Sequence, residues 1–397
     1  MNTDPESRPN RRASIERIGH RIRLPLPGRG ASGRGPYVAS RVGVFLGIAI
    51  AVCFSTGLIG HWIQHPPGWF FWPANPVWLY RCTQGLHVLS GIAAVPLLLV
   101  KLWAVYPRLF QRPVLGSPLR VLERGSIAVL VGATLFQLST GLSNIAQLYA
   151  WRFFFTTTHY AMAYVAVGAL AVHLAVKLPV IREALRRPRP EAPDRPADPA
   201  AVSRRAALAA AGTATVVATL AVAGQTVPFL RRISVAAPRS GEGSQGVPVN
   251  RTAAAAGIAT AARSPDYRLA VTVDGRTRLF AFEELLRLPR TSARLPIACV
   301  EGWSVDAEWA GVRLVNLLDA VAPYPGGDVR FESLETAGLY RTSVLPRRHV
   351  VDAQTLIALE VNGHRLDLDH GYPCRLMAPN RPGVLQTKWL SRIEVLS

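Results

Sequence analysis

Five long apolar segments constrain this chain more than any other feature of its sequence. They lie at 42–60, 82–100, 125–149, 153–176 and 206–227. Each is about the length needed to cross ~30 Å of hydrocarbon. A large soluble protein buries an occasional helix of this kind, but five in succession predict a multi-pass membrane protein. None lies at the extreme N-terminus, so none reads as a cleaved signal peptide.

The charge composition fits a membrane protein with its basic residues on one side. The formal net charge is +20, although charged residues make up only 18% of the chain. A soluble nucleic-acid-binding protein with this net charge would carry more charged residues and fewer apolar runs, so no nucleic-acid partner is expected. The nine Trp, 13 Phe and 10 Tyr exclude a disordered basic protein. The four cysteines form neither a disulfide framework nor a CxxC metal pair.

The distribution of Lys and Arg predicts the orientation of the spans. Segments 1–41, 101–124 and 177–205 carry nine, five and eight of these residues, whereas 61–81 and 150–153 carry one each. Because cytoplasmic loops are the richer in Lys and Arg, the N-terminus is expected in the cytoplasm. Five spans across the cytoplasmic (inner) membrane then place the C-terminal region outside the cytoplasm.

The chain is expected to have five parts. They are a basic cytoplasmic tail that contacts anionic lipid, a four-helix transmembrane domain, a Pro/Arg-rich linker, a fifth span and an extracytoplasmic domain, at 1–40, 41–180, 181–203, 204–230 and 231–397. The motif Ser203-Arg204-Arg205 before the weakly apolar fifth span resembles a twin-arginine export signal. Such signals serve domains that fold around a cofactor before crossing the membrane. The positive-inside rule alone also accounts for two arginines at this place.

Three histidines lie inside the apolar segments. An ionisable side chain within a membrane span indicates a functional site, and neutral imidazole is a ligand of haem iron. His87 and His159 lie five and six residues from the outer ends of their spans, so together they could hold one iron. His173 follows His159 by 14 residues, about 21 Å along the same helix face. The alternative is a pair of histidines bonded to backbone or water, with no metal.

Two motifs give residues 38–180 a resemblance to a known family. "QGLHVLSG", with His87, and "HYAMAYVAVGALAVH", with His159 and His173, resemble the four-helix cytochrome b subunit of membrane-bound formate dehydrogenases. In that family a histidine near the cytoplasmic start of the first helix completes an inner haem site. This sequence has "SRVGVFLG" there. One haem b is therefore expected, held by His87 and His159, and His173 marks a second site that lacks its partner.

The region after Asp266 predicts an α+β domain with its own core. Residues 267–273 and 276–282 alternate between apolar and polar, and Asp274-Gly275 between them is a hairpin turn. Asn362-Gly363 predicts a second turn, followed by a short strand at 365–368. The apolar period of 312–321 predicts a helix.

Cys299 stands at the end of a predicted strand, just before "VEGWS". It could be a buried apolar residue, or the soft thiolate that a redox transition metal selects. "CVEGWSVDAEWAGVRLVNLLDAV", with "DHGYPCR" and "QTKW" further on, resembles the molybdopterin domain of the sulfite oxidase family over 247–397. Within that family, the catalytic subunit of periplasmic protein-methionine-sulfoxide reductases is the most similar. The resemblance implies a molybdenum held by the pterin and by Cys299.

The same resemblance assigns pterin and phosphate contacts to seven residues: Asn250, Ser333, His370, Arg375, Gln386, Thr387 and Lys388. Cys374, on the opposite face of its strand from Arg375, is expected in the core. Sulfite oxidases carry an arginine a few residues after the metal-binding cysteine. Here Glu301 stands close behind Cys299, and a carboxylate repels an anionic substrate. A neutral S-oxide or N-oxide is therefore expected.

These expectations combine into one enzyme. A haem b bundle takes electrons from membrane quinol and passes them to a molybdenum centre, which removes oxygen from a small or protein-bound oxidised sulfur compound. The enzymatic alternative runs in reverse, oxidising a small sulfur compound and reducing quinone. A non-enzymatic alternative is a haem conduit whose outer domain has lost its cofactor and binds a partner.

Overall fold

The five apolar segments form five long helices in the computed structural model of the chain. The structure describes residues 34–109, 118–186, 202–237 and 243–396, so most of the basic tail and of the Pro/Arg-rich linker lies outside it. The helices are α1 (Pro36–Gln64), α2 (Leu79–Leu109), α3 (Pro118–Ile145), α4 (Phe155–Arg186) and α5 (Arg204–Ala223). All five are long and apolar enough to span a membrane, and their number among the described residues is the predicted one.

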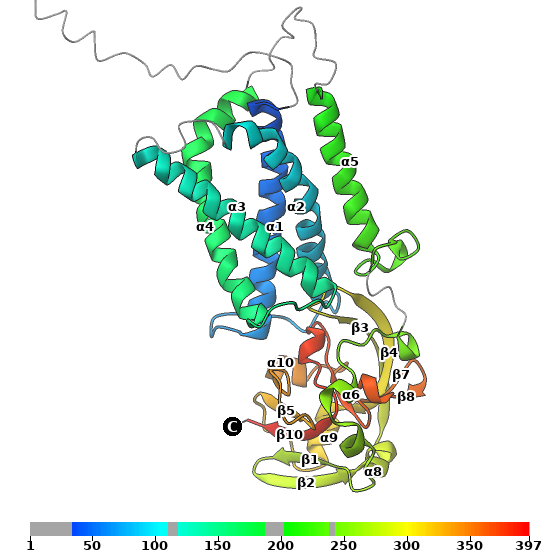
Figure 1. Ribbon diagram of the computed structural model, residues 1–397. Coiled ribbons are helices and arrows are strands. Elements are labelled where there is room, and N and C mark those ends of the chain that lie inside the picture. Colours follow the sequence, from blue (N-terminus) through cyan, green and yellow to red (C-terminus); the bar gives the residue numbers. More distant parts are fainter. Residues whose placement is uncertain (1–33, 110–117, 187–201, 238–242, 397) are drawn as a thin grey trace, which may run out of the picture.

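Helices α1 to α4 form a bundle, and α5 stands beside it along α2 (Figure 1). Ala207 and Ala211 of α5 are buried in one apolar cluster with Val42 of α1 and Leu97 of α2. Small residues let two helices approach closely where no side chain keeps them apart. Ser203 begins α5 as its N-cap, since its hydroxyl accepts a hydrogen bond from the Ala206 N–H at 3.1 Å.

The C-terminal domain contains two sheets. The first has the order β2-β1-β10-β5-β6 and consists of β1 (Arg268–Val273), β2 (Arg276–Ala281), β5 (Val329–Ser333), β6 (Thr342–Leu345) and β10 (Leu390–Val395). The second has the order β3-β4-β7-β8, with β9 also on β7, and consists of β3 (Arg290–Ala298), β4 (Ser304–Arg313), β7 (Leu356–Val361), β8 (His364–Arg365) and β9 (Arg375–Met377). Between the named strands of the described residues, the β1–β10 pairing is parallel and the others are antiparallel.

Short helices connect the strands. They are α6 (Ala253–Ala256), α7 (Ala259–Arg263), α8 (Phe282–Arg287), α9 (Leu314–Asp319) and α10 (Arg347–Val350), with 3₁₀ turns at Pro228–Leu230, Ser244–Gly246, Leu368–His370 and Gly383–Leu385. One apolar cluster is formed by residues of both sheets and contains Cys374. Another lies on the second sheet and contains Cys299. The α+β class is as predicted, and the two cysteines belong to different clusters.

Two local predictions need correction. The helix predicted over 312–321 covers only Leu314–Asp319, because Val312 and Arg313 end β4 and pair with β7. The strand predicted over 365–368 stops at Arg365, because the chain turns into the 3₁₀ helix that carries His370. Both hairpin turns are confirmed: Asp274, Gly275, Asn362 and Gly363 all have positive φ.

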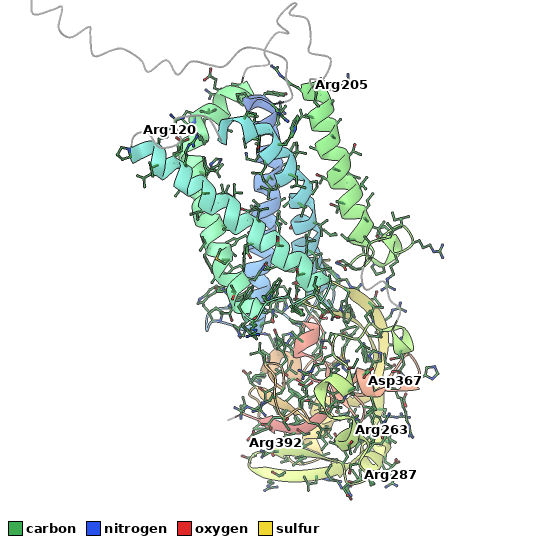
Figure 2. The ribbon with its side chains drawn as sticks, in the orientation of Figure 1. Arg120, Arg205, Arg263, Arg287, Asp367 and Arg392 are labelled. Carbon is green, nitrogen blue, oxygen red and sulfur yellow. The ribbon has the colours of Figure 1, made fainter. Side chains whose placement is uncertain are left out.

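The C-terminal domain lies against one end of the helices (Figure 1). Arg81, in the first turn of α2, forms two hydrogen bonds of 2.8 and 3.0 Å with the carboxylate of Asp306 and one of 2.6 Å with the Ser304 hydroxyl. Arg120 and Arg205 lie at the far end of the helices (Figure 2). These two basic residues therefore lie at the end of the bundle away from the C-terminal domain.

Candidate functional site

Cys299 lies at the end of β3 in a tight turn beneath the helices. Its side chain is 1% exposed. The Cys299 N–H donates to the Trp303 carbonyl at 2.9 Å, and the Gly302 N–H donates to the Cys299 carbonyl at 3.0 Å. Gly302 has φ +94°, which only glycine adopts without strain. This turn presents Cys299 to a small cavity that is also lined by Asn250, His370, Arg375 and Lys388.

Arg375 is a buried cation beside Cys299. It is 3% exposed, lies over the ring of Trp309 and donates to the carbonyls of His370 (3.0 Å) and Gln386 (3.2 Å). Among the described residues, its buried Nε has no hydrogen-bond partner. Arg375 also forms no ion pair with a carboxylate there. A buried charge normally has an opposite charge beside it. The arginine therefore fits an anionic group of a bound ligand.

Lys388 and His370 complete the polar wall of this cavity. The Lys388 ammonium donates to the side chain of Asn250 (3.3 Å) and to the carbonyls of Arg251 (2.6 Å) and Asp369 (3.0 Å). His370 Nε2 lies 2.6 Å from the Ser244 carbonyl, so this nitrogen carries the proton. A thiol ligand beside two cations and an amide fits a metal carried by a phosphate-bearing cofactor.

Three residues of the predicted set do not line the cavity. The Gln386 side chain pairs with both backbone groups of Ala378, at 2.8 and 2.7 Å. The Thr387 hydroxyl bonds that of Ser343 at 2.6 Å, and the Ser333 hydroxyl accepts from the Glu335 N–H at 3.2 Å. Of these three residues, Gln386 contributes to the site through its backbone, because its carbonyl accepts a hydrogen bond from Arg375. The structure thus brings Asn250, His370, Arg375 and Lys388 together around Cys299, and it gives Ser333, Gln386 and Thr387 structural bonds.

Glu301 does not face the cavity either. Its carboxylate is 8% exposed and accepts hydrogen bonds from Trp303 Nε1 (2.9 Å) and from Gln147 Nε2 (2.6 Å) in the loop after α3. The carboxylate is directed toward the membrane helices. Glu301 does not line the Cys299 cavity, and both of its oxygens accept hydrogen bonds from other groups, so the expectation that it repels an anionic substrate stays a prediction.

Lys388 makes the anion affinity of this cavity depend on pH. Burial, and then the charge of Arg375, lower the pKa of Lys388 to about 7. A bound anion stabilises the protonated amine, so above pH 7 binding must take up a proton. We expect the Kd of the cofactor-free protein for sulfate to rise about tenfold per pH unit from pH 7.5 to 9. Calorimetry measures this rise, and Lys388→Met should remove it; a flat profile for the unmodified chain would contradict the assignment.

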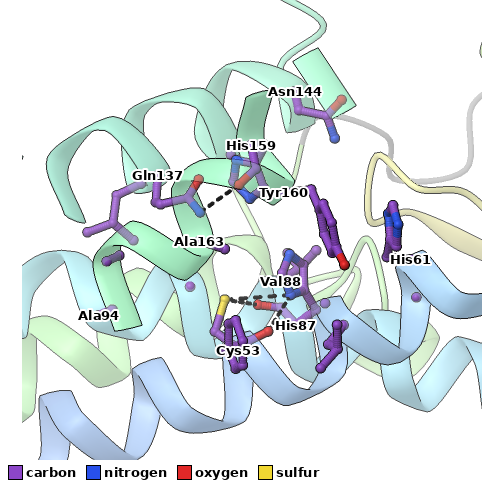
Figure 3. Close-up of a pocket in the computed structure, with 18 of the residues that line it drawn as sticks. Cys53, His61, His87, Val88, Ala94, Gln137, Asn144, His159, Tyr160 and Ala163 are labelled. Carbon is purple, nitrogen blue, oxygen red and sulfur yellow. Dashed lines mark hydrogen bonds between the residues drawn. The ribbon is translucent and has the colours of Figure 1, made fainter. Parts of the chain in front are cut away.

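A second cavity, of about 230 Å³, lies inside the bundle and holds His87 of α2 and His159 of α4 (Figure 3). The two ring centres are 6.4 Å apart. An iron bonded to one nitrogen of each ring at about 2.0–2.1 Å would hold the ring centres roughly 6 Å apart. A methyl group at Gly57 of α1 would come within 2.8 Å of the His87 ring, so this glycine leaves room for the histidine.

Hydrogen bonds fix the same tautomer in both rings. His87 Nδ1 lies 2.8 Å from the Cys53 carbonyl and must donate to it. His159 Nδ1 lies 3.0 Å from the Thr140 hydroxyl, whose own hydrogen is already directed at the Phe136 carbonyl (2.7 Å). Each ring therefore keeps a lone pair on Nε2, the arrangement of a metal-binding histidine with a supporting hydrogen bond. The two histidines fit a haem iron.

His173 lies outside this cavity. The charged groups near its ring are Lys101, Lys177 and Glu123. Lys177 and Glu123 form an ion pair with each other. The sequence offers no partner histidine for His173, and the two lysines near it, Lys101 and Lys177, do not ligate haem iron.

One residue joins the two cavities. Val300, next to Cys299, lines the cavity of His87 and His159. Its carbonyl accepts hydrogen bonds from Gln84 of α2 (3.0 Å) and from Asn144 of α3 (3.2 Å). These contacts join residues 156 and 216 positions apart, and no local pattern in the sequence indicates them. For Gln84 the sequence gives one weak indication of a role at this site, which is its position three residues before His87.

Comparison with known proteins assigns the C-terminal domain. Residues 256–397 match the family model described as the oxidoreductase molybdopterin binding domain. Mitochondrial sulfite oxidase of Mus musculus is 39% identical over 99 residues, which is 23% of this chain and 18% of that protein. Uncharacterized oxidoreductase YuiH of Bacillus subtilis is 31% identical over 118 residues, 29% of this chain and 58% of that protein.

Two further relatives differ in what their names describe. A protein of Azospira oryzae, provisionally named protein-methionine-sulfoxide reductase subunit YedZ1, is 28% identical over 116 residues, 29% of this chain and 43% of that protein. The solved sulfane dehydrogenase SoxCD of Paracoccus pantotrophus is 28% identical with a TM-score of 0.31, covering 33% of this chain and 38% of that one. The chain thus spans less than two thirds of each relative. The expected molybdopterin domain is confirmed.

Proposed function

We propose that this chain, whose C-terminal region is a sulfite-oxidase-type molybdopterin oxidoreductase domain, exchanges electrons between a haem b in its bundle and a molybdenum centre at Cys299. The observation that carries the proposal is the position of Val300. It lines the cavity of His87 and His159, and its peptide neighbour is the cysteine of the other site. Two redox groups placed this close need no separate carrier protein.

The cavity residues have distinct roles in holding the molybdenum cofactor. When bound, that cofactor supplies two-electron oxygen-atom transfer. Cys299 ligates the metal as a thiolate. Arg375 and Lys388 neutralise the phosphate, and Asn250 and His370 bind the pterin. Cys299, His370 and Arg375 are buried, which excludes water from their side of the cavity and strengthens the charge-assisted hydrogen bonds of Arg375.

The proposed reaction is the reduction of an S-oxide or N-oxide. An S-oxide takes two electrons and two protons and yields a sulfide and water. The electrons come from membrane quinol, which reaches the bundle from the bilayer. The similarity to a protein-methionine-sulfoxide reductase subunit supports this direction. Oxidation of a small sulfur compound with quinone as acceptor is the second candidate, which the similarity to sulfite oxidases favours.

Haem spectroscopy distinguishes the two directions. The purified protein is reduced under nitrogen until the haem band is that of ferrous iron, and methionine sulfoxide is added. Reoxidation of the haem within the turnover time is the expected result. Sulfite is added to the oxidised protein in parallel, and haem reduction there would establish the reverse direction. If neither compound changes the spectrum, the proposed electron path is wrong.

The proposed orientation puts the C-terminal domain outside the cytoplasm. Arg120 and Arg205 lie at the opposite end of the helices, in agreement with the positive-inside rule (Figure 2). The domain folds around its cofactor first, and Arg204 and Arg205 at the start of α5 act as the export signal. Digestion of the C-terminal domain by protease added to intact spheroplasts tests the orientation; full protection would refute it.

A further inference from the structure

A flat pair of aromatic rings forms part of the wall of the bundle cavity. His61 of α1 and Tyr160 of α4 both line this cavity, and both side chains are half-buried. Their rings stack face to face, with the ring centres 3.7 Å apart and the planes 10° apart (Figure 3). His61 lies in the last turn of α1, so the pair stands near the end of the bundle that contacts the C-terminal domain.

This ring pair lies next to both proposed haem ligands. Tyr160 directly follows His159 in α4. His61 follows Gly57 by one helical turn, about 6 Å along the axis. A methyl group on Gly57 would come within 2.8 Å of the His87 ring. A small molecule held by His61 would therefore lie beside the haem.

Partly exposed residues of α1 and α4 line one side of the cavity. Phe54 of α1 and Ala163 of α4 both line it and are half-buried. Tyr164, one turn beyond Tyr160, is 47% exposed and meets the Phe54 ring edge to face at 5.6 Å. Apolar side chains exposed on a spanning helix contact lipid. The seam between α1 and α4 therefore gives a lipid-soluble molecule access to the cavity.

The His61 ring carries free hydrogen-bonding capacity. Among the described residues its ring nitrogens have no hydrogen-bond partner. The neighbouring polar groups are engaged: the Gln64 side-chain oxygen accepts from the Tyr340 hydroxyl at 3.0 Å, and the hydroxyls of Tyr160 and Tyr164 bond each other at 2.9 Å. A neutral imidazole has one N–H and one lone pair. His61 can therefore accept a hydrogen bond from a hydroxyl that enters the cavity.

We propose that His61 and the adjoining wall form the binding site of a membrane quinol, and that the His61 imidazole accepts a hydrogen bond from one quinol hydroxyl. This inference rests on the proposed function, which takes electrons from quinol but assigns it no site. A quinol is flat, lipid-soluble and carries hydroxyl donors, which matches an aromatic wall, an entrance from the bilayer and one free acceptor. The ring substituents would contact the apolar part of the lining: Phe54, Leu58, Ala163 and Val167.

His61 is also placed to serve as the base of quinol oxidation. The oxidation of one quinol to quinone releases two electrons and two protons. Ferric haem accepts the electrons one at a time, and His61 accepts the protons in turn and passes them to water at the outer end of α1. A base at the hydroxyl promotes the reaction because the ring gives up electrons more readily as the O–H proton leaves.

His61→Phe in the full-length haem-loaded protein tests the binding site. Phenylalanine keeps the stack on Tyr160 but cannot accept the hydrogen bond. His65→Phe is the matched control, because His65 is exposed at the end of the same helix and does not line the cavity. The probe is the quinol analogue 2-heptyl-4-hydroxyquinoline N-oxide, whose fluorescence falls on binding. We expect its Kd to rise about tenfold in His61→Phe, as loss of a buried hydrogen bond does, and to stay unchanged in the control.

Reduction of the haem by decylubiquinol gives a second readout in the same samples. We expect the stopped-flow rate to fall about 10²–10⁴-fold in His61→Phe, as loss of a general base does. Turnover driven by a viologen dye should be unchanged, because the dye reduces the molybdenum site directly. Haem content should equal that of His65→Phe.

Each outcome decides the proposal. Equal Kd values and equal reduction rates for the two variants would overturn it. Loss of haem from His61→Phe alone would also overturn it, because His61 would then serve haem retention. If the expected binding and reduction results are found but methionine sulfoxide does not reoxidise the haem, the proposed direction of the reaction fails while the quinol site stands.

Discussion

Replacing Cys299 by serine is expected to lower kcat by more than about 10³-fold while the haem spectrum stays unchanged. A serine hydroxyl is a hard ligand that stays protonated at neutral pH, so it cannot replace a thiolate on a soft metal. The proposed haem ligands, His87 and His159, lie on α2 and α4, in the other cavity. Turnover with a viologen dye and the optical spectrum of the same sample measure the two effects.

Cys374 provides the matched control for this experiment. It is also fully buried, but it belongs to the apolar cluster formed by residues of both sheets, with its sulfur 3.3 Å from the Tyr267 hydroxyl. Burial raises the pKa of Cys374 to about 12, so this thiol is not a thiolate at neutral pH. Cys374→Ala should retain activity and molybdenum and lose only stability. Full activity of Cys299→Ser would show that the metal has another ligand.

Replacing His87 or His159 by alanine is expected to remove the haem and to stop quinol-driven turnover. Loss of a residue that only supports a metal ligand costs 10–100-fold in affinity, and loss of the ligand itself costs at least ~100-fold. Viologen-driven turnover should continue, because the dye reduces the molybdenum site directly. His173→Ala should leave both activities and the spectrum unchanged.

Haem counting completes this test. The pyridine haemochrome assay should give one haem per chain for the unmodified protein and for His173→Ala, and none for the other two variants. Two haems per chain would contradict the single site. A second haem at His173 would need another iron ligand besides this histidine, and the charged groups near it are Lys101, Lys177 and Glu123.

Patterns local in the sequence predicted most of the fold. A run of some twenty apolar residues has few stable conformations other than a spanning helix, so all five helices were predictable. The dipeptides Asp274-Gly275 and Asn362-Gly363 gave the hairpin turns, because both positions of such a turn need positive φ. The helix predicted over 312–321 failed at its start, because pairing with β7 outweighs the helical period at Val312 and Arg313.

Contacts between distant residues were beyond such prediction. Val300 is an ordinary residue in sequence, and only the docking of α2 and α3 makes it the link between two cavities. The Tyr80 N–H donates to the side-chain oxygen of Asn380, 300 positions away. The family motif also could not separate direct from indirect roles: Gln386 and Thr387 share it with Lys388, but their side chains bond the protein itself.

The burial of the Cys299 turn sets an order of maturation. The sulfur is covered by the chain itself, and the same turn is pressed against the bundle, where a methyl group on Gly302 would come within 2.7 Å of Val88. A cofactor the size of a pterin cannot pass these contacts once they have formed. We therefore expect insertion of the cofactor to precede docking, and molybdenum supplied after docking should not restore activity.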